Sequence, residues 1–255
     1  PLQNMIDQEI EALYKPQSVD VISSRLLLTH PFYGHVLFAL DKEFSKDIPT
    51  LAIRYRPNRP LALVVNEEFW YGLGNSNHQK GVLIHEILHV VFGHMELMFD
   101  FPNRKLFNIA ADLVVNQNIE DDLLPKTAVG KNNEFDGCFD YNKSHSVHYY
   151  YNELEKLQKA GNEKMMEMLD SLLSNVENHK FWEEFKKLSR VEQEGIIQQV
   201  GGLLKEGIKE SKGCGVPIRI VKQMMMVWEL NEPEIDWRSE LRRVIQTPQG
   251  RKATI

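Results

Sequence analysis

The segment from about Gln79 to Phe99 constrains the fold more than any other part of the chain. Its apolar residues recur at helical spacing, which predicts a long helix with an apolar surface. His85, Glu86 and His89 nevertheless lie among these apolar residues. A polar group in a protein core costs free energy unless it has a partner. The segment therefore predicts a buried helix whose polar residues have a specific role.

The spacing of the two histidines favours a metal site. His85 and His89 are four residues apart, so both imidazoles project from one face of a helix and can bind one ion. Zinc is the expected ion, because it accepts neutral imidazole nitrogens and leaves a position for water. Glu86 lies about 100° further around the helix, where its carboxylate can act as general base on that water. The alternative is a solvated histidine pair without metal, which the apolar neighbours disfavour.

A catalytic zinc usually takes three protein ligands, and Asp112 is the strongest candidate for the third. It lies in a second apolar helix expected from about Leu106 to Ile119. Metal coordination would remove the cost of burying its carboxylate. Asn108 and Asn116, four residues before and after it, lie on the same face and could orient the ligands. The alternative is that Asp112 pairs with a basic side chain or caps a neighbouring helix.

His94 is the rival third ligand. It lies nine residues after His85 and about 180° around a continuous helix, so it can reach the same metal only if the helix breaks. Gly93 would permit a break. The metzincin pattern, however, places its glycine and its third histidine at other spacings. We therefore expect His94 to contact the end of the helix or to support a ligand rather than to bind the metal.

Outside these helices, the pattern predicts an α+β fold that is mostly helical, with a small sheet beside the helix of His85 and His89. We expect the first fifty residues to be helical, with helices near 4–13 and 18–29. Leu51–Tyr55 and Leu61–Val65 read as two strands joined by a turn with Pro and Asn. The prolines place at least one of these strands at a sheet edge.

The rest of the chain adds a long loop at 122–146 and then helices, with one apolar face around Met165–Leu173, one opened by Pro217 and one at Trp237. His145 and His148 could line a cleft, although a solvated helix start is the simpler interpretation. Cys138 is expected to be inert. We find no repeat and no linker, which predicts a single domain over residues 1–255.

Composition excludes several classes of protein. The chain has 255 residues, 42% of them hydrophobic, and a formal net charge of −6. We expect no dedicated nucleic-acid binding from such a charge. No apolar run reaches the roughly 18 residues of a membrane span, and no signal peptide is recognisable. Two cysteines cannot form a disulfide framework. These features predict a cytoplasmic protein without a membrane partner.

Several motifs together resemble the metallopeptidase domain that precedes a von Willebrand A-like domain in many bacterial and phage proteins. The resemblance covers most of residues 25–245. Its matching elements are Pro31-Phe32-Tyr33-Gly34, Asn66-Glu67-Glu68-Phe69, His85-Glu86-Ile87-Leu88-His89 with Gly93-His94, Asn108 through Asn116, and Trp237-Arg238.

The resemblance implies a zincin-like fold, with His85, His89 and Asp112 on zinc and Glu86 as the catalytic acid and base. It also implies a partner of the ATPase or von Willebrand A type, although no von Willebrand A-like domain is present in this chain. The expected activity is zinc-dependent hydrolysis of a peptide or protein substrate, by an endopeptidase rather than an exopeptidase. The alternative is a catalytically silent metal-binding domain that acts as a binding or assembly module.

Overall fold

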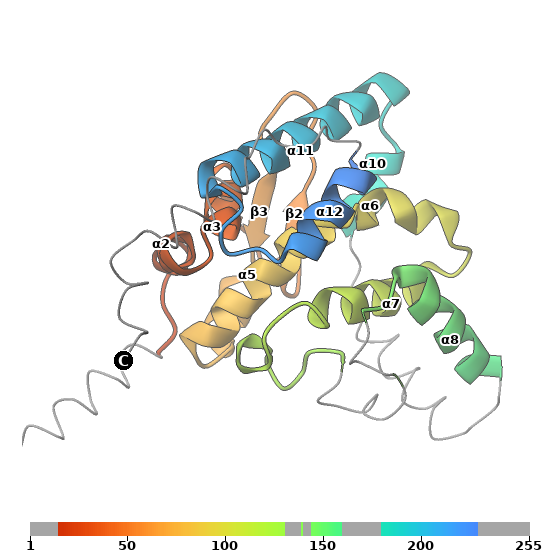
Figure 1. Ribbon diagram of the computed structural model, residues 1–255, viewed down its shortest axis with the longest axis horizontal. Coiled ribbons are helices and arrows are strands. Elements are labelled where there is room, and N and C mark those ends of the chain that lie inside the picture. The colour runs from red at the N-terminus through yellow and green to blue at the C-terminus, as the bar shows by residue number, and fades with distance from the viewer. Residues whose placement is uncertain (1–14, 131–138, 140–143, 160–179, 229–255) are drawn as a thin grey trace, which may run out of the picture.

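The computed structural model describes residues 15–130, 139, 144–159 and 180–228 (Figure 1). Four sequence-based predictions lie outside these residues: the helix near 4–13, Cys138, the apolar face at 165–173 and the helix at Trp237. Of the predicted loop at 122–146, residues 122–130, 139 and 144–146 are described.

The sheet has three strands, β1 (Asp41–Phe44), β2 (Leu51–Arg54) and β3 (Ala62–Val65), in the order β1-β3-β2. β2 runs antiparallel to β3, with Ile53 opposite Leu63, and β1 runs parallel to it. The two predicted strands are confirmed, and β2 is the one at an edge. Leu61–Val65 cannot serve as an edge, because β3 pairs on both sides. β1 also corrects the prediction that the first fifty residues are helical.

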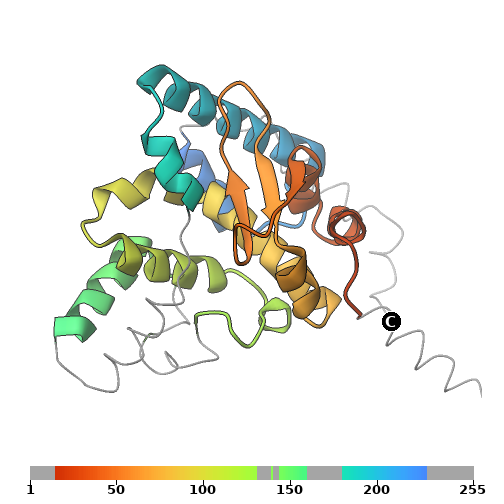
Figure 2. The same ribbon diagram turned by 180° about the vertical axis from the view of Figure 1, so that it is seen from behind.

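Most of the helices lie on one side of this sheet, in front of it in Figure 1 and behind it in Figure 2. α2 (Val19–Thr29) and α3 (Pro31–Phe38) pack on each other, and α3 packs on the long helix α11 (Arg190–Ser211). The contact is close because Gly207 of α11 lies against the side chains of Phe32 and Val36. α12 (Ile218–Val227) follows α11 and contacts the central helix α5.

α4 (Glu67–Gly72) leads into α5 (Ser76–Val91), the helix that carries the two histidines. The Asn75 side chain caps the start of α5 by accepting a hydrogen bond from His78 N–H. α5 contacts β2, so the sheet lies beside this helix as predicted. At Gly93 the backbone is left-handed, with φ of 64°. The predicted continuous helix to Phe99 is therefore wrong.

After Gly93 the chain changes direction by 62° into α6 (His94–Leu97) and the 3₁₀ helix η1 (Met98–Asp100). Trp228, just after α12, stabilises the end of α5 from a distant part of the chain. Its indole N–H donates to the carbonyls of Val90 and Val91, at 3.1 and 3.2 Å. The last carbonyls of a helix lack helical partners, so this contact fixes where α5 ends.

α7 (Arg104–Asn116) crosses beside α5 and packs on α8 (Val147–Lys159). The 3₁₀ helix η2 (Asp121–Leu123) lies against α5 at Gly81, and α10 (Lys180–Lys186) lies beside β2 (Figure 2). The described chain is thus a mixed α+β structure, mostly helical, with one small sheet. Within it, no single helix has the length and hydrophobicity of a membrane span, although α5 and the bent His94–Asp100 segment meet those criteria together.

Candidate metal centre

Two neighbouring helices bring three metal-binding side chains together. α5 supplies His85 and His89 from successive turns, and α7 supplies Asp112. The Nε2 atoms of the two histidines are 2.9 Å apart, and Asp112 Oδ1 lies 3.5 Å from His85 Nε2 and 3.2 Å from His89 Nε2. The predicted third ligand therefore faces both rings.

Asn116, one turn beyond Asp112 on α7, fixes the orientation of the His85 ring. Its Nδ2 donates to the carbonyl of Val129 at 2.6 Å, which leaves Oδ1 to accept from His85 Nδ1 at 2.8 Å. The hydrogen of His85 is thereby held on Nδ1, and the lone pair of Nε2 points toward Asp112. The sequence placed Asn116 on the face of Asp112, and its role in orienting a metal ligand stays a prediction.

His94 contacts the other histidine rather than joining the cluster. The break at Gly93 brings its Nδ1 to 2.9 Å from His89 Nδ1. His94 is 1% exposed. When His89 donates from Nδ1 to His94 Nδ1, the Nε2 atom of His89 carries no hydrogen and also presents a lone pair to Asp112. Three acceptor atoms then converge, and such an arrangement is stable only with a cation or added protons between them.

The separations of these acceptors fit a tetrahedral metal ion. With metal–nitrogen bonds of 2.0–2.1 Å, two tetrahedral ligands lie about 3.3 Å apart, and the observed separations run from 2.9 to 3.5 Å. Asp112 Oδ1 is moreover a buried side-chain oxygen without a hydrogen-bond partner. A cation bound by His85, His89 and Asp112 would satisfy it.

The electrostatics of the cluster favour a bound cation. Burial raises the pKa of Asp112, but the two histidines outweigh burial and hold the pKa well below its usual range. Burial lowers the pKa of His89 to about 4, partly offset by Asp112. For His85, burial lowers the pKa, but Asp112, Glu86 and Asn116 together outweigh burial, so the pKa is raised. Asp112 is thus an anion, and His89 is neutral and able to coordinate near neutral pH.

Glu86 lies beside the cluster without being part of it. The side chain is on the next position of α5 and is 8% exposed. Among the described residues its carboxylate makes no hydrogen bond or ion pair. Burial raises its pKa to about 7; His85 lowers it and Asp112 raises it further. A carboxyl group with such a pKa can both accept and return a proton at neutral pH.

The remaining candidates from the sequence lie elsewhere. Asn108 Oδ1 is buried without a hydrogen-bond partner, one turn before Asp112. The His145 ring stacks on Tyr149 at 3.8 Å, and the His148 ring lies 4.9 Å from Phe101. Neither His145 nor His148 belongs to the metal-binding cluster found in the described residues.

Sequence reasoning missed one contact to the site. Trp182 of α10 packs its ring against His89, with centroids 5.4 Å apart. The two residues are so far apart in the sequence that no local pattern connects them. The adjacent aromatic residues Phe181 and Trp182 were the available signal in the sequence, and both are buried in the structure.

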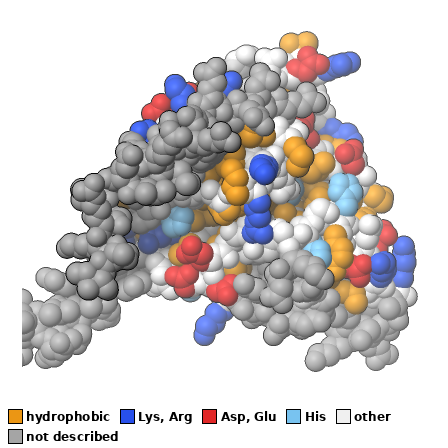
Figure 3. All heavy atoms as spheres, viewed as in Figure 1, with side chains coloured by type: hydrophobic (Ala, Val, Ile, Leu, Met, Phe, Trp, Pro, Cys, Tyr) orange, Lys and Arg blue, Asp and Glu red, His pale blue; other side chains and the backbone are white. Residues whose placement is uncertain are grey.

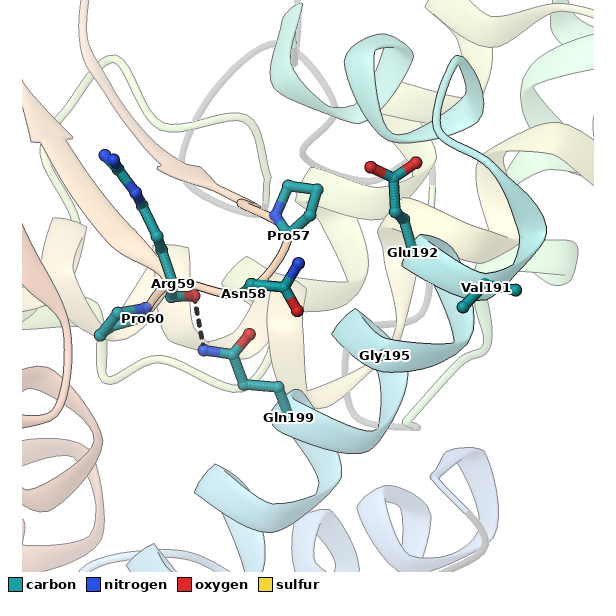
Figure 4. Close-up of a pocket in the computed structure, with 8 residues that line it drawn as sticks. All are labelled: Pro57, Asn58, Arg59, Pro60, Val191, Glu192, Gly195 and Gln199. Atoms are coloured by element: carbon teal, nitrogen blue, oxygen red, sulfur yellow. Dashed lines mark hydrogen bonds between the residues drawn. The ribbon is translucent and has the colours of Figure 1, made fainter.

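A separate pocket of about 460 Å³ lies between the β2–β3 connection and the start of α11 (Figure 4). Its wall is held by a 2.8 Å hydrogen bond from Gln199 Nε2 to the carbonyl of Arg59. None of the residues that line it is a candidate ligand. On the face in Figure 3, acidic and basic side chains are interspersed over the described surface.

The chain matches one known protein family over most of its length. Residues 19–255 match the family described as "Putative metallopeptidase domain", and the chain belongs to that family. The match includes all the residues of the cluster. The family points to metal-dependent hydrolysis of peptides or proteins. No curated protein and no solved structure matches the chain.

Proposed function

We propose that this protein is a zinc-dependent endopeptidase whose metal ligands are His85, His89 and Asp112. The observation that carries this proposal is the convergence of two imidazole nitrogens and a buried carboxylate oxygen within 4.8 Å of one another. The family supports metal-dependent proteolysis. Zinc fits the donor set best, because two imidazoles and one carboxylate leave a tetrahedral position open.

The residues around the ion have separate tasks. A bound zinc ion supplies the Lewis acidity that activates water and the scissile carbonyl. Asn116 and His94 hold the imidazoles of His85 and His89 in their binding orientation. Glu86 accepts a proton from the attacking water and passes it to the leaving amine. Its raised pKa, about 7, suits both transfers.

The edge strand β2 is the proposed site for an extended substrate. Asn66 N–H donates to Thr50 O at 2.9 Å. In an antiparallel pair, the backbone N–H and C=O groups of alternate residues point to the partner strand, so those of Ala52 and Arg54 point to β3. The N–H and C=O groups of Leu51, Ile53 and Tyr55 therefore point to the outer edge. A peptide added there would pair through its main chain, beside the helix that carries the histidines. We propose the zincin-like arrangement on this basis.

The alternative, a catalytically silent metal-binding module, keeps the same ligands, so metal content alone does not separate the two functions. The substitution Glu86→Gln does. We expect it to lower hydrolysis of a fluorescently labelled unfolded protein by about 10²–10⁴-fold, with zinc content unchanged. Equal activity in the wild type and the variant would refute the role of Glu86. A zinc-loaded wild type that cleaves nothing in a whole proteome would favour the silent module.

A further inference from the structure

α10 lies beside the outer edge of β2 (Figure 2). Phe181 packs with Ile48 and Val64, and the Arg54 guanidinium lies 4.1 Å from the centroid of its ring. Side chains alternate between the faces of a strand, and Leu63 and Val65 belong to the main core. Phe181 therefore packs on the face of the sheet that is turned away from the main core.

The next turn of α10 contacts the opposite face and the metal centre. The Phe185 ring lies 6.4 Å from the ring of Tyr55, which follows β2, and Trp182 packs on His89. Phe181, Trp182 and Phe185 are each at most 4% exposed. One short helix thus extends from the edge strand to a metal ligand, along the path of a peptide held on β2.

The edge of β2 beside α10 is buried, and no described strand pairs with its backbone. Ile53 is 3% exposed, and its outward N–H and C=O have no hydrogen-bond partner among the described residues. A helix covers such an edge without pairing with it, because its own backbone groups bond to one another. Each buried backbone group without a partner costs about 1–3 kcal/mol. An extended peptide in place of α10 would recover those hydrogen bonds.

We propose that α10 is an autoinhibitory cover, and that peptide substrates bind only after α10 leaves β2. The proposal rests on the proposed peptidase function and adds its regulation. α10 has seven residues, too few for a stable helix by itself. Its polar contacts are exposed: Glu183 pairs with Arg104 at 2.8 Å, and Lys186 Nζ lies 4.7 Å from the Phe99 ring. What holds α10 in place is therefore mainly the burial of its three aromatic rings, a cost that a bound peptide would have to offset.

The test compares variants in a zinc-loaded Glu86→Gln background, so that hydrolysis does not interfere. The probe is a fluorescent tetrapeptide of Leu and Ala that ends in a hydroxamate, and anisotropy gives its Kd. In the release variant, Phe181→Ala with Phe185→Ala, both anchors on β2 are removed without touching a histidine. The control, Phe32→Ala, loses a buried ring of α3 that packs on Tyr33 and against Gly207 of α11.

We expect the release variant to bind the probe at least about tenfold more tightly than its parent, because the parent must first displace α10. Amide exchange at Leu51–Tyr55 should accelerate in the release variant and not in the control. The milder Glu183→Arg should shift Kd in the same direction, and Arg104→Glu added to it should reverse the shift. This pair of variants keeps the test valid if the double alanine variant folds poorly.

Equal or weaker probe binding by the release and Glu183→Arg variants would overturn the cover. Tighter binding by the control as well would also overturn it, since general loosening would then explain the gain. When Glu86 is retained, we expect the release variant to hydrolyse labelled casein faster than the wild type does. If the affinity gain appears and no form cleaves casein, the cover stands and the proposed peptidase function fails.

Discussion

At the scale of single residues, the site depends on which atom of each imidazole carries the hydrogen. Asn116 can accept from His85 Nδ1 because its own amide nitrogen is bound to Val129 O. One turn of α7 thus carries Asp112, the candidate third ligand, and the next carries Asn116, which hydrogen-bonds to His85. The spacing of these residues was readable in the sequence, since both positions lie on one helical face.

Asn116 therefore provides a direct test of ligand orientation. We expect Asn116→Ala to weaken zinc binding by about 10–100-fold, because the His85 ring loses its orienting acceptor. Asn116→Asp keeps an acceptor oxygen and should retain most of the affinity. Competition with a zinc-binding dye measures the change. Asn118→Ala, two residues on, is the matched control, and an equal loss there would contradict a specific role for Asn116.

The Glu86 carboxylate makes the stability of the metal-free protein depend on pH. Its pKa is raised from 4.5 to about 7 in the folded chain. The contribution of the protonated carboxyl to the free energy of unfolding is therefore complete below pH 4.5 and is lost as the pH rises through 7. Glu86→Gln removes the effect. We expect the variant to be more stable than the wild type by roughly 3 kcal/mol at pH 8, with the difference vanishing below pH 4.5.

Urea unfolding of both proteins in the presence of a chelator, at a series of pH values, measures this difference. Because the wild type and the variant share His85, His89 and Asp112, the titrations of those groups cancel to first order in the comparison. A stability difference that is independent of pH would show that burial does not perturb Glu86.

At the scale of elements, the break after α5 positions His94. Gly93 has a φ of 64°, and a Cβ there would lie 2.6 Å from Val227 Cγ1. The sequence allowed a break at this glycine but did not require one, because its dihedral angle depends on packing against α12. The contact of the Trp228 indole with the end of α5 was not predictable either, because Trp228 lies far from α5 in the sequence.

Gly93→Ala should therefore destabilise the protein by about 1–2 kcal/mol through the left-handed backbone, and by more because of the contact with Val227. We expect Val227→Ala in the Gly93→Ala background to recover part of the loss. Denaturant midpoints of the two single variants and the double variant give the coupling between them. Additive effects would contradict the close contact between Gly93 and α12.

Strand β1 shows why part of the sheet escaped prediction. Asp41-Lys42-Glu43-Phe44 has little hydrophobic alternation, and none of its four residues is buried. The strand forms because β3 offers an unpaired edge and because Arg56 pairs with Asp41 and Glu43. β2 and β3 were predictable because their apolar runs are flanked by Pro and Asn.

At the scale of the whole molecule, the candidate site depends on three regions that lie far apart in the sequence. α5 and α7 carry the candidate metal ligands, α12 with Trp228 stabilises the end of α5, and α10 lies beside β2 and against His89. The sequence predicted the first of these because its residues follow helical periodicity. The other two depend on long-range packing, for which a single sequence carries no periodic signal.

Anomalous scattering at the zinc absorption edge from crystals of the zinc-loaded protein tests the central claim most directly. The account predicts one strong peak per chain, with His85 Nε2, His89 Nε2 and a carboxylate oxygen of Asp112 about 2.0–2.2 Å from the metal, and with Asn116 still bonded to His85. A peak at another place, or a zinc ion at the two histidines with Asp112 turned away, would contradict it.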